Sequence, residues 1–191
     1  MRFWHNTGSG IELKKRICGA TKWLFPYLCL AMLIAGAVSC AKSGEDKTAD
    51  NALAPSFVLP DTDGKSMALA DYRGKIVVIE FFATWCEPCK HTAQMLQSIS
   101  ETYRDRGVAV LGVSIDEGDE VPSKLKTFMR QHNMKYPVVI DNGLVKKQYN
   151  VYALPTTIIV DRDGRIAKRH FGIIPDYSKK LMADIERLQK L

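Results

Sequence analysis

The pattern that most constrains the fold is an apolar run followed closely by two cysteines that are two residues apart. The run Ile76–Phe82 is apolar except for Glu80, as expected for a strand that is buried on both faces. Cys86 and Cys89 follow it, and residues 89–103 then carry apolar side chains at helical spacing. We therefore predict that the cysteine pair lies at a strand-to-helix junction, with Cys86 near the N-terminus of the helix.

A cysteine pair at that position favours thiol–disulfide exchange. The unpaired N–H groups and the dipole of a helix N-terminus stabilise a thiolate, which is the species that attacks a disulfide. A structural zinc site would need further ligands, but no cysteine follows Cys89 and the histidines stand apart. Covalent haem attachment would need a histidine where Lys90 stands. A purely structural disulfide across so short a loop would add little stability.

The first forty residues have the layout of an export signal. Residues 1–22 carry five basic side chains and one acidic one, and residues 23–38 are apolar and uncharged. This segment supplies four of the six net positive charges, so the basic balance gives no argument for nucleic-acid binding. The basic end is expected to stay in the cytoplasm while the rest of the chain is exported. We predict that residues 1–40 are a signal peptide.

Cys40 is the candidate lipidation site. Small residues at 35–39 precede it, which resembles a bacterial lipoprotein processing site, although Ala37 stands where a leucine is usual. Cleavage by ordinary signal peptidase and retention as a signal anchor are the alternatives. We favour the lipoprotein route, because it leaves Cys86 and Cys89 as the only free thiols of the exported protein.

Beyond the signal, residues 41–53 are polar and are predicted to be a flexible tether, and residues 54–191 a single domain. Strands are expected at 54–60, 66–69, 76–82, 108–115, 136–140, 156–161 and 165–171, and helices at 89–103, 122–132, 143–149 and 176–190. Strands that alternate with helices, followed by a hairpin and a last helix, indicate an α/β domain with a mixed sheet.

Five short motifs occur together in this domain: Ala54–Phe57, Asp71–Lys75, Ala83–Cys89, Leu154–Thr157 and Asp161–Gly164. Their combination resembles the TlpA/ResA/DsbE-like (AhpC/TSA-redoxin) group of exported thioredoxin-like thiol-disulfide oxidoreductases, over roughly residues 54–190. The resemblance implies a thioredoxin fold with an N-terminal β-hairpin and a central strand–helix insertion near residues 108–135, in a mixed sheet flanked by helices.

The resemblance also implies roles for individual residues. Cys86 would attack the disulfide of a substrate and Cys89 would resolve the mixed disulfide. Pro155 would be a cis proline that faces the cysteines, and Leu154 before it would pair through its backbone with bound substrate. Trp85 would shield and shape the site.

Glu80 lies six residues before Cys86, where thioredoxin carries a buried aspartate that relays a proton for the second cysteine. Its apolar neighbours predict a buried carboxylate with a hydrogen-bond partner or a raised pKa, and we expect it to help deprotonate Cys89. Glu87 and Pro88 separate the cysteines and would tune the redox potential, since the charge of Glu87 opposes a thiolate. Thr92 stands where many relatives carry a glutamate.

The sequence therefore predicts an enzyme of the bacterial periplasm, anchored to the membrane through its N-terminus, that reduces disulfides of exported proteins. Cytochrome c maturation is one candidate process, and a membrane electron donor would re-reduce the pair. We expect a monomer that uses no metal and no cofactor besides the Cys86–Cys89 disulfide. The alternatives are a thiol peroxidase, although the Pro-x-x-x-Thr-x-x-Cys spacing is missing at Cys86, and a non-catalytic binding module, which would keep its function in Cys86→Ser.

Overall fold

The computed structural model describes residues 51–191. The predicted signal peptide at 1–40, the predicted lipidation site Cys40 and most of the predicted tether lie outside the described residues. No helix within residues 51–191 is long and apolar enough to cross a membrane.

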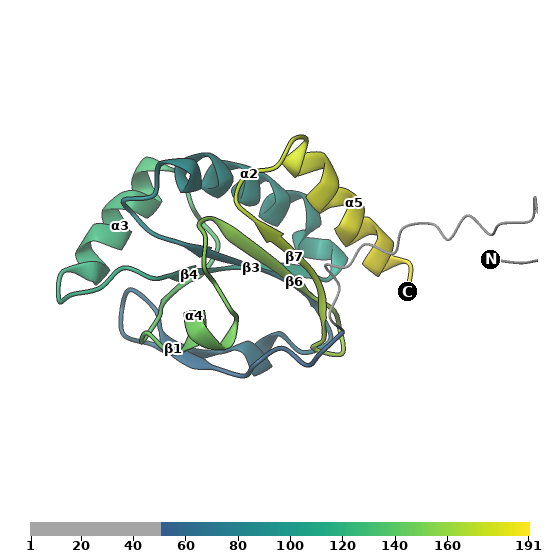
Figure 1. The fold of residues 1–191 in the computed structure, drawn as a ribbon, viewed down its shortest axis with the longest axis horizontal. Helices are drawn as coiled ribbons and strands as arrows, with labels where there is room; N and C mark the ends of the chain where they lie inside the picture. Colours follow the sequence, from purple (N-terminus) through teal and green to yellow (C-terminus); the bar gives the residue numbers. More distant parts are fainter. Residues whose placement is uncertain (1–50) are drawn as a thin grey trace, which may run out of the picture. The chain divides into compact units, whose positions relative to one another are not determined.

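A five-stranded mixed sheet forms the centre of the domain (Figure 1). Its strands are β3 (Ile76–Phe82), β4 (Val108–Ser114), β5 (Val138–Ile140), β6 (Thr156–Val160) and β7 (Ile166–Phe171). They lie in the order β5-β4-β3-β6-β7, with β3, β4 and β5 parallel and with β6 antiparallel to both β3 and β7. A separate hairpin is formed by β1 (Val58–Pro60) and β2 (Ser66–Ala68).

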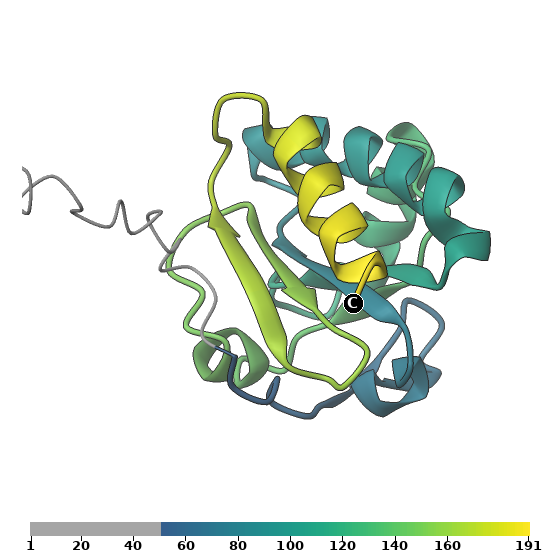
Figure 2. The same ribbon diagram turned by 90° about the vertical axis from the view of Figure 1, so that its right-hand side faces the viewer.

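Helices and the hairpin cover the two faces of this sheet. The helices are α2 (Glu87–Tyr103), α3 (Val121–Gln131), α4 (Val145–Gln148) and α5 (Tyr177–Gln189), with 3-10 turns at Leu69–Tyr72 and Arg104–Arg106. One core cluster joins α2, α3 and α5 to the sheet, and the other joins β1 and α4 to its opposite face. In Figure 2 α5 lies beside α2, and the hydroxyl of Tyr103 donates to Glu186 between them.

The buried central strand explains this two-sided layering. Every residue of β3 is buried, as its apolar sequence predicts. Since side chains alternate along a strand, Val78 and Phe82 contact the helical face while Ile79 and Phe81 contact the hairpin face. The same alternation places Glu80 on the face covered by the helices.

The predicted thioredoxin fold is confirmed, with its N-terminal hairpin and its inserted β4–α3 segment. Several boundaries differ from the sequence-based expectation: β1 begins at Val58 instead of residue 54, β5 begins at Val138 instead of residue 136, and most of the other differences are one or two residues. Two further differences bear on the site and on the extent of the domain. Helix α2 begins at Glu87 instead of Cys89, because Pro88 fits the first turn of a helix, where no N–H partner is lost. Residues 51–53, assigned to the tether, hydrogen-bond along β7, where Asn51 donates to the carbonyl of Ile166, so the ordered domain includes them.

Candidate active site

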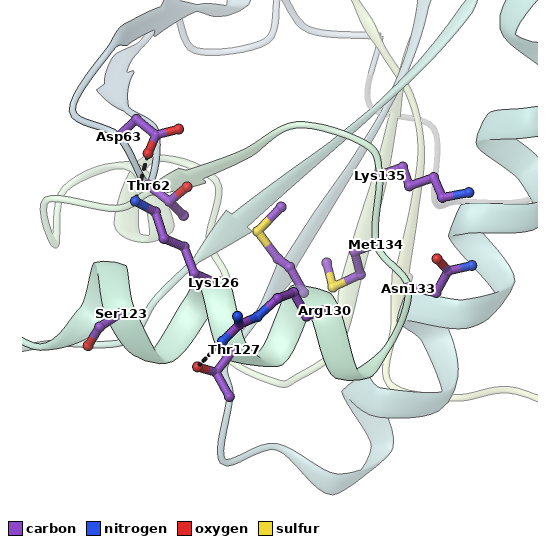
Figure 3. A pocket seen from close by; sticks show the side chains of 10 residues that line it. Thr62, Asp63, Ser123, Lys126, Thr127, Arg130, Asn133, Met134 and Lys135 are labelled. Carbon is purple, nitrogen blue, oxygen red and sulfur yellow. Dashed lines mark hydrogen bonds and ion pairs between the residues drawn. The ribbon is translucent and has the colours of Figure 1, made fainter.

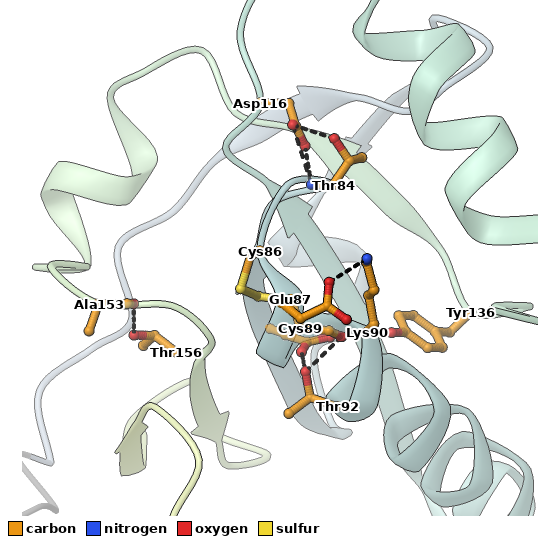
Figure 4. The surroundings of a disulfide bond; sticks show 11 residues. Thr84, Cys86, Glu87, Cys89, Lys90, Thr92, Asp116, Tyr136, Ala153 and Thr156 are labelled. Atoms are coloured by element: carbon orange, nitrogen blue, oxygen red, sulfur yellow. Dashed lines mark hydrogen bonds and ion pairs between the residues drawn. A yellow bond between two sulfur atoms is a disulfide. The ribbon is translucent and has the colours of Figure 1, made fainter. Parts of the chain in front are cut away.

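Cys86 and Cys89 form a disulfide at the start of α2, with their Cα atoms 5.3 Å apart (Figure 4). Cys86 is the N-cap residue of the helix, and its carbonyl accepts the N–H of Cys89 at 3.1 Å. The two sulfur-bearing residues differ in access, since Cys86 is 5% exposed and Cys89 is completely buried. An incoming sulfur can therefore reach Cys86 first.

A groove of about 560 Å³ borders Cys86. Trp85 and Tyr152 line it, and their side chains are 71% and 76% exposed. The Tyr152 ring stacks on Phe171 with the ring centroids 4.5 Å apart, which fixes the position of the Tyr152 side chain. Large apolar rings that stay in water around a reactive disulfide are typical of a surface that binds another molecule. Sequence analysis identified Trp85 but missed Tyr152, because its position depends on the path of the loop before β6.

One wall of the groove is the loop that leads into β6, which also carries Tyr152. The Leu154–Pro155 peptide bond is cis, as predicted, and Leu154 lines the groove together with Cys86. The hydroxyl of Thr156 donates to the carbonyl of Ala153 at 2.7 Å and fixes this loop (Figure 4). The structure thus brings the predicted substrate-binding residues Trp85, Leu154 and Pro155 to one end of the sheet, beside the disulfide.

Asp116 holds the loop that carries the disulfide. It follows β4, whose carboxyl end lies beside that of β3. Its carboxylate accepts the backbone N–H of Thr84 at 2.9 Å, the hydroxyl of Thr84 at 2.7 Å and the hydroxyl of Ser114 at 2.7 Å. Sequence analysis left Asp116 without a role, in the connection between the strand expected at 108–115 and the helix expected at 122–132. A carboxylate directly after a buried strand that neighbours β3 was the signal that could have identified it.

Glu80, on β3, is a carboxylate with no exposure to solvent. Burial raises the pKa of Glu80 to about 7, while hydrogen bonds from the hydroxyls of Thr92 and Tyr136 lower it in part. The Tyr136 hydroxyl lies 3.3 Å from Glu80 Oε2, and Thr92 donates to Oε1. The prediction that Glu80 is a buried carboxylate with a hydrogen-bond partner is confirmed, and Figure 4 shows Thr92 and Tyr136 beside the helix turn of Cys89. A pKa near 7 is suited to a group that exchanges protons at neutral pH.

Gly112 makes room for the side chains that pack beside this carboxylate. It pairs with Glu80 in the register of β3 and β4. A Cβ atom at Gly112 would lie 3.0 Å from Val138 Cγ2 and 3.1 Å from Phe82 Cε1, both closer than an ordinary contact, and 3.5 Å from Cε2 of Tyr136. The sequence signal was a glycine inside a buried strand, which marks a close approach of another group.

Glu87 lies at the surface of the first turn of α2 and forms an ion pair of 2.5 Å with Lys90. The hydrogen bond from Lys90 lowers the pKa of Glu87, and the charge of Lys90 adds to this effect. The negative charge that the sequence places beside Cys86 is therefore compensated locally. Pro88 completes the turn and lines the groove.

A larger groove of about 770 Å³ lies between α3 and the turn that joins β1 to β2 (Figure 3). Lys126 forms an ion pair of 2.6 Å with Asp63 across it, and Arg130 and Met134 also line it. Neither cysteine contributes to its lining, so disulfide chemistry belongs to the smaller groove. Within residues 51–191, no group of three or more His, Cys, Asp or Glu side chains is placed to hold a metal ion.

The comparisons with known proteins agree with this geometry. The model of the AhpC/TSA family matches residues 51–169. The thiol-disulfide oxidoreductase ResA of Bacillus cereus (strain ATCC 10987 / NRS 248) is 34% identical over 145 residues, which cover 73% of this chain and 82% of that protein. ResA of Bacillus subtilis (strain 168) is 32% identical over 160 residues, with 83% and 86% covered.

Solved structures show the same fold. A crystal structure of a thiol:disulfide interchange protein DsbE from Chlorobium tepidum has a TM-score of 0.68 at 27% identity, and the match covers 73% of this chain and 96% of that one. The exposed lipoprotein thioredoxin of Streptococcus pneumoniae has a TM-score of 0.60 at 28% identity, with 70% of this chain and 100% of that one covered.

Proposed function

Because this chain belongs to the AhpC/TSA family and is a thioredoxin-fold thiol-disulfide oxidoreductase, we propose that it reduces disulfides of exported proteins outside the cytoplasm. The observation that carries this proposal is the Cys86–Cys89 disulfide at the N-cap of α2, with one cysteine at a groove and the other buried. That asymmetry suits a reaction in which the two sulfurs act in turn.

The reaction begins with both cysteines reduced. The Cys86 thiolate attacks one sulfur of the substrate disulfide, so a mixed disulfide forms and the other substrate sulfur leaves as a thiolate. Cys89 then loses its proton and attacks Cys86. The Cys86–substrate bond breaks, the second substrate thiolate leaves, and the Cys86–Cys89 disulfide forms. Two electrons pass from the protein to the substrate, and a membrane-bound thiol reductant would return them.

Trp85 and Leu154 would bind the substrate chain on either side of Cys86, and the cis Pro155 would leave the backbone of Leu154 open to a partner strand. Glu80 would accept the proton of Cys89 in the second step. Cys89 and Glu80 are both completely buried, so a carboxylate with a pKa near 7 is a suitable acceptor for that proton.

The reducing direction is supported by the charges around Cys86. Strong oxidants stabilise their thiolate heavily, whereas here the positive charge of Lys90 is taken up by its ion pair with Glu87. A redox titration against glutathione tests the direction. We expect a potential near that of thioredoxin, about −270 mV, and a potential above about −180 mV would instead assign an oxidant or isomerase.

The proposed location rests on the N-terminal sequence. A basic segment followed by an apolar one precedes Cys40, and one structural relative, from Streptococcus pneumoniae, is an exposed lipoprotein. Metabolic labelling with a fatty acid should mark the full chain and not its Cys40→Ala variant. Equal labelling of both proteins, or of neither, would refute lipidation at Cys40.

The substrate can be identified by trapping. A Cys89→Ala variant would retain its substrate as a mixed disulfide on Cys86, and mass spectrometry would then identify the protein bound. Apocytochrome c among the trapped proteins would support a role in cytochrome c maturation. Consumption of peroxide by the purified protein, with no trapped partner, would favour a thiol peroxidase instead.

A further inference from the structure

The hydroxyl of Thr92 lies between the buried carboxylate and the turn that carries the resolving cysteine. Its Oγ1 is hydrogen-bonded to Glu80 Oε1 and lies 3.0 Å from the backbone carbonyl of Cys89. Thr92 is buried, and Glu80 is completely so. A hydroxyl has one proton, so it can donate to only one of these two acceptors at a time.

The protonation of Glu80 decides which acceptor receives that proton. When Glu80 is ionised it can only accept, so Thr92 donates to it. When Glu80 is protonated, its own O–H donates to Thr92 Oγ1, and the Thr92 proton is free to turn to the carbonyl of Cys89. In both states every buried polar group keeps a partner, which is what a buried site of this kind requires.

We propose that Thr92 is a positioning residue that couples the protonation of Glu80 to the turn holding Cys89. This inference rests on the proposed role of Glu80 in the second step of the reaction. As the Cys89 proton moves to Glu80, the Cys89 sulfur attacks Cys86 and the substrate thiolate departs. The hydroxyl of Thr92 then stops donating to Glu80 and donates to the carbonyl of Cys89 instead. The carboxylic acid that forms on Glu80 donates its own proton to Thr92 Oγ1, which stabilises it.

No other described contact of Glu80 links it to the cysteine-bearing helix by a hydrogen bond. Tyr136 donates to Oε2 from the segment before β5. Tyr177, on α5, interacts electrostatically with Glu80, but its hydroxyl donates to Thr157. Cys89 becomes titratable once the disulfide is reduced. Among these groups Thr92 alone is both a donor and an acceptor between Glu80 and Cys89.

The charge of Glu80 determines in which direction its pKa changes when the Thr92 hydroxyl is lost. Donation by Thr92 stabilises the ionised carboxylate and lowers its pKa. Thr92→Val keeps the shape of the side chain but removes the hydroxyl, so the pKa of Glu80 should rise further. Fewer molecules then have an ionised Glu80 at neutral pH. The acid limb of the pH–rate profile, where the rate falls as the pH is lowered, therefore moves to higher pH.

The test is the pH dependence of the second step, measured as the rate at which a preformed mixed disulfide on Cys86 releases its thiol. In Thr92→Val we expect the acid limb to move up by roughly 0.5 to 1 pH unit, with release slowed roughly threefold to fivefold at pH 7. Thr92→Ser keeps the hydroxyl and should restore the wild-type limb. If Thr92→Val does not fold, the comparison of Thr92→Ala with Thr92→Ser decides in the same way.

Glu80→Gln separates this inference from the proposed function. If Glu80→Gln abolishes the limb while loss of the Thr92 hydroxyl leaves the limb in place, Thr92 has no coupling role and the role of Glu80 stands. If Glu80→Gln leaves the limb unchanged, the proposed proton acceptor is wrong and the inference falls with it. We expect the double variant Glu80→Gln, Thr92→Val to behave like Glu80→Gln alone.

Discussion

The two cysteines of one helical turn lie in opposite surroundings. Cys86 borders a groove with the exposed rings of Trp85 and Tyr152, whereas Cys89 is buried on the side of Glu80. The groove side offers apolar surface that a substrate chain can cover. The buried side offers hydroxyls and a carboxylate whose pKa is raised to about 7. The comparison teaches that one short motif can divide a reaction between a binding surface and a proton-accepting site. This is possible because one cysteine of the first helical turn borders the groove while the other lies in the protein interior.

The largest expected effect is the difference between two variants, one in which serine replaces Cys86 and one in which serine replaces Cys89. Cys86→Ser should abolish both turnover and mixed-disulfide formation, since Cys89 is inaccessible. Cys89→Ser should still form the mixed disulfide but fail to release it. Gel analysis of the reduced variants with a peptide disulfide measures both steps. A mixed disulfide in Cys86→Ser would show that the two environments do not separate the roles.

Removal of the buried charge should stabilise the fold at high pH. Because the pKa of Glu80 is raised from 4.5 to about 7 in the folded protein, the stability tied to its protonation is fully present below about pH 4.5. That stability falls as the pH rises through 7, by about 3 kcal/mol in total. Glu80→Gln should remove this fall. Urea unfolding at pH 5 and pH 8.5 compares the two proteins, and parallel losses of stability in both would contradict the assignment.

Loss of the Asp116 carboxylate should loosen the loop that both environments share. Asp116→Ala leaves the N–H and hydroxyl of Thr84 and the hydroxyl of Ser114 without their acceptor. We expect a loss of about 1–3 kcal/mol in the free energy of unfolding, and a smaller loss for Asp116→Asn. Thermal unfolding provides the measurement. Unchanged stability in Asp116→Ala would mean that the hydrogen bonds to Asp116 do not stabilise this loop.

The smallest effect is expected on the groove side. Tyr152→Ala removes an exposed ring, so stability should change little, while KM for a protein disulfide should rise roughly threefold to tenfold. A small disulfide such as oxidised glutathione should react at the wild-type rate. Leu144→Ala is the matched control, since Leu144 is 58% exposed but does not line the groove. Equal effects of the two substitutions on KM would remove Tyr152 from the binding surface.

The features that sequence analysis found are local in the chain. The strand Ile76–Phe82 was predicted to the residue, because a seven-residue run that is apolar except for Glu80 and rich in β-branched and aromatic side chains favours a buried strand over a helix. The buried state of Glu80 followed from the same run. The cis bond at Pro155 came from the resemblance to a family and not from the residues themselves, since most X–Pro bonds are trans.

The features that were missed depend on contacts between distant segments. Tyr136 reaches Glu80 across 56 residues of sequence, and Asp116 reaches Thr84 across 32. Tyr152 and Phe171 stack only because the loop before β6 folds back on β7. The sequence can mark one member of such a pair, as it does for Asp116 at the end of a buried strand, but the partner is set by strand order and register.

The most direct test of the two-sided site is to time its two steps separately. Rapid mixing of the reduced protein with a chromogenic mixed-disulfide substrate resolves attack by Cys86 from resolution by Cys89. At pH 7, Glu80→Gln should leave the attack rate unchanged while slowing resolution by about 100-fold and removing its dependence on pH near 7. Equal slowing of both steps, or of neither, would contradict the division of labour between Cys86 and Cys89.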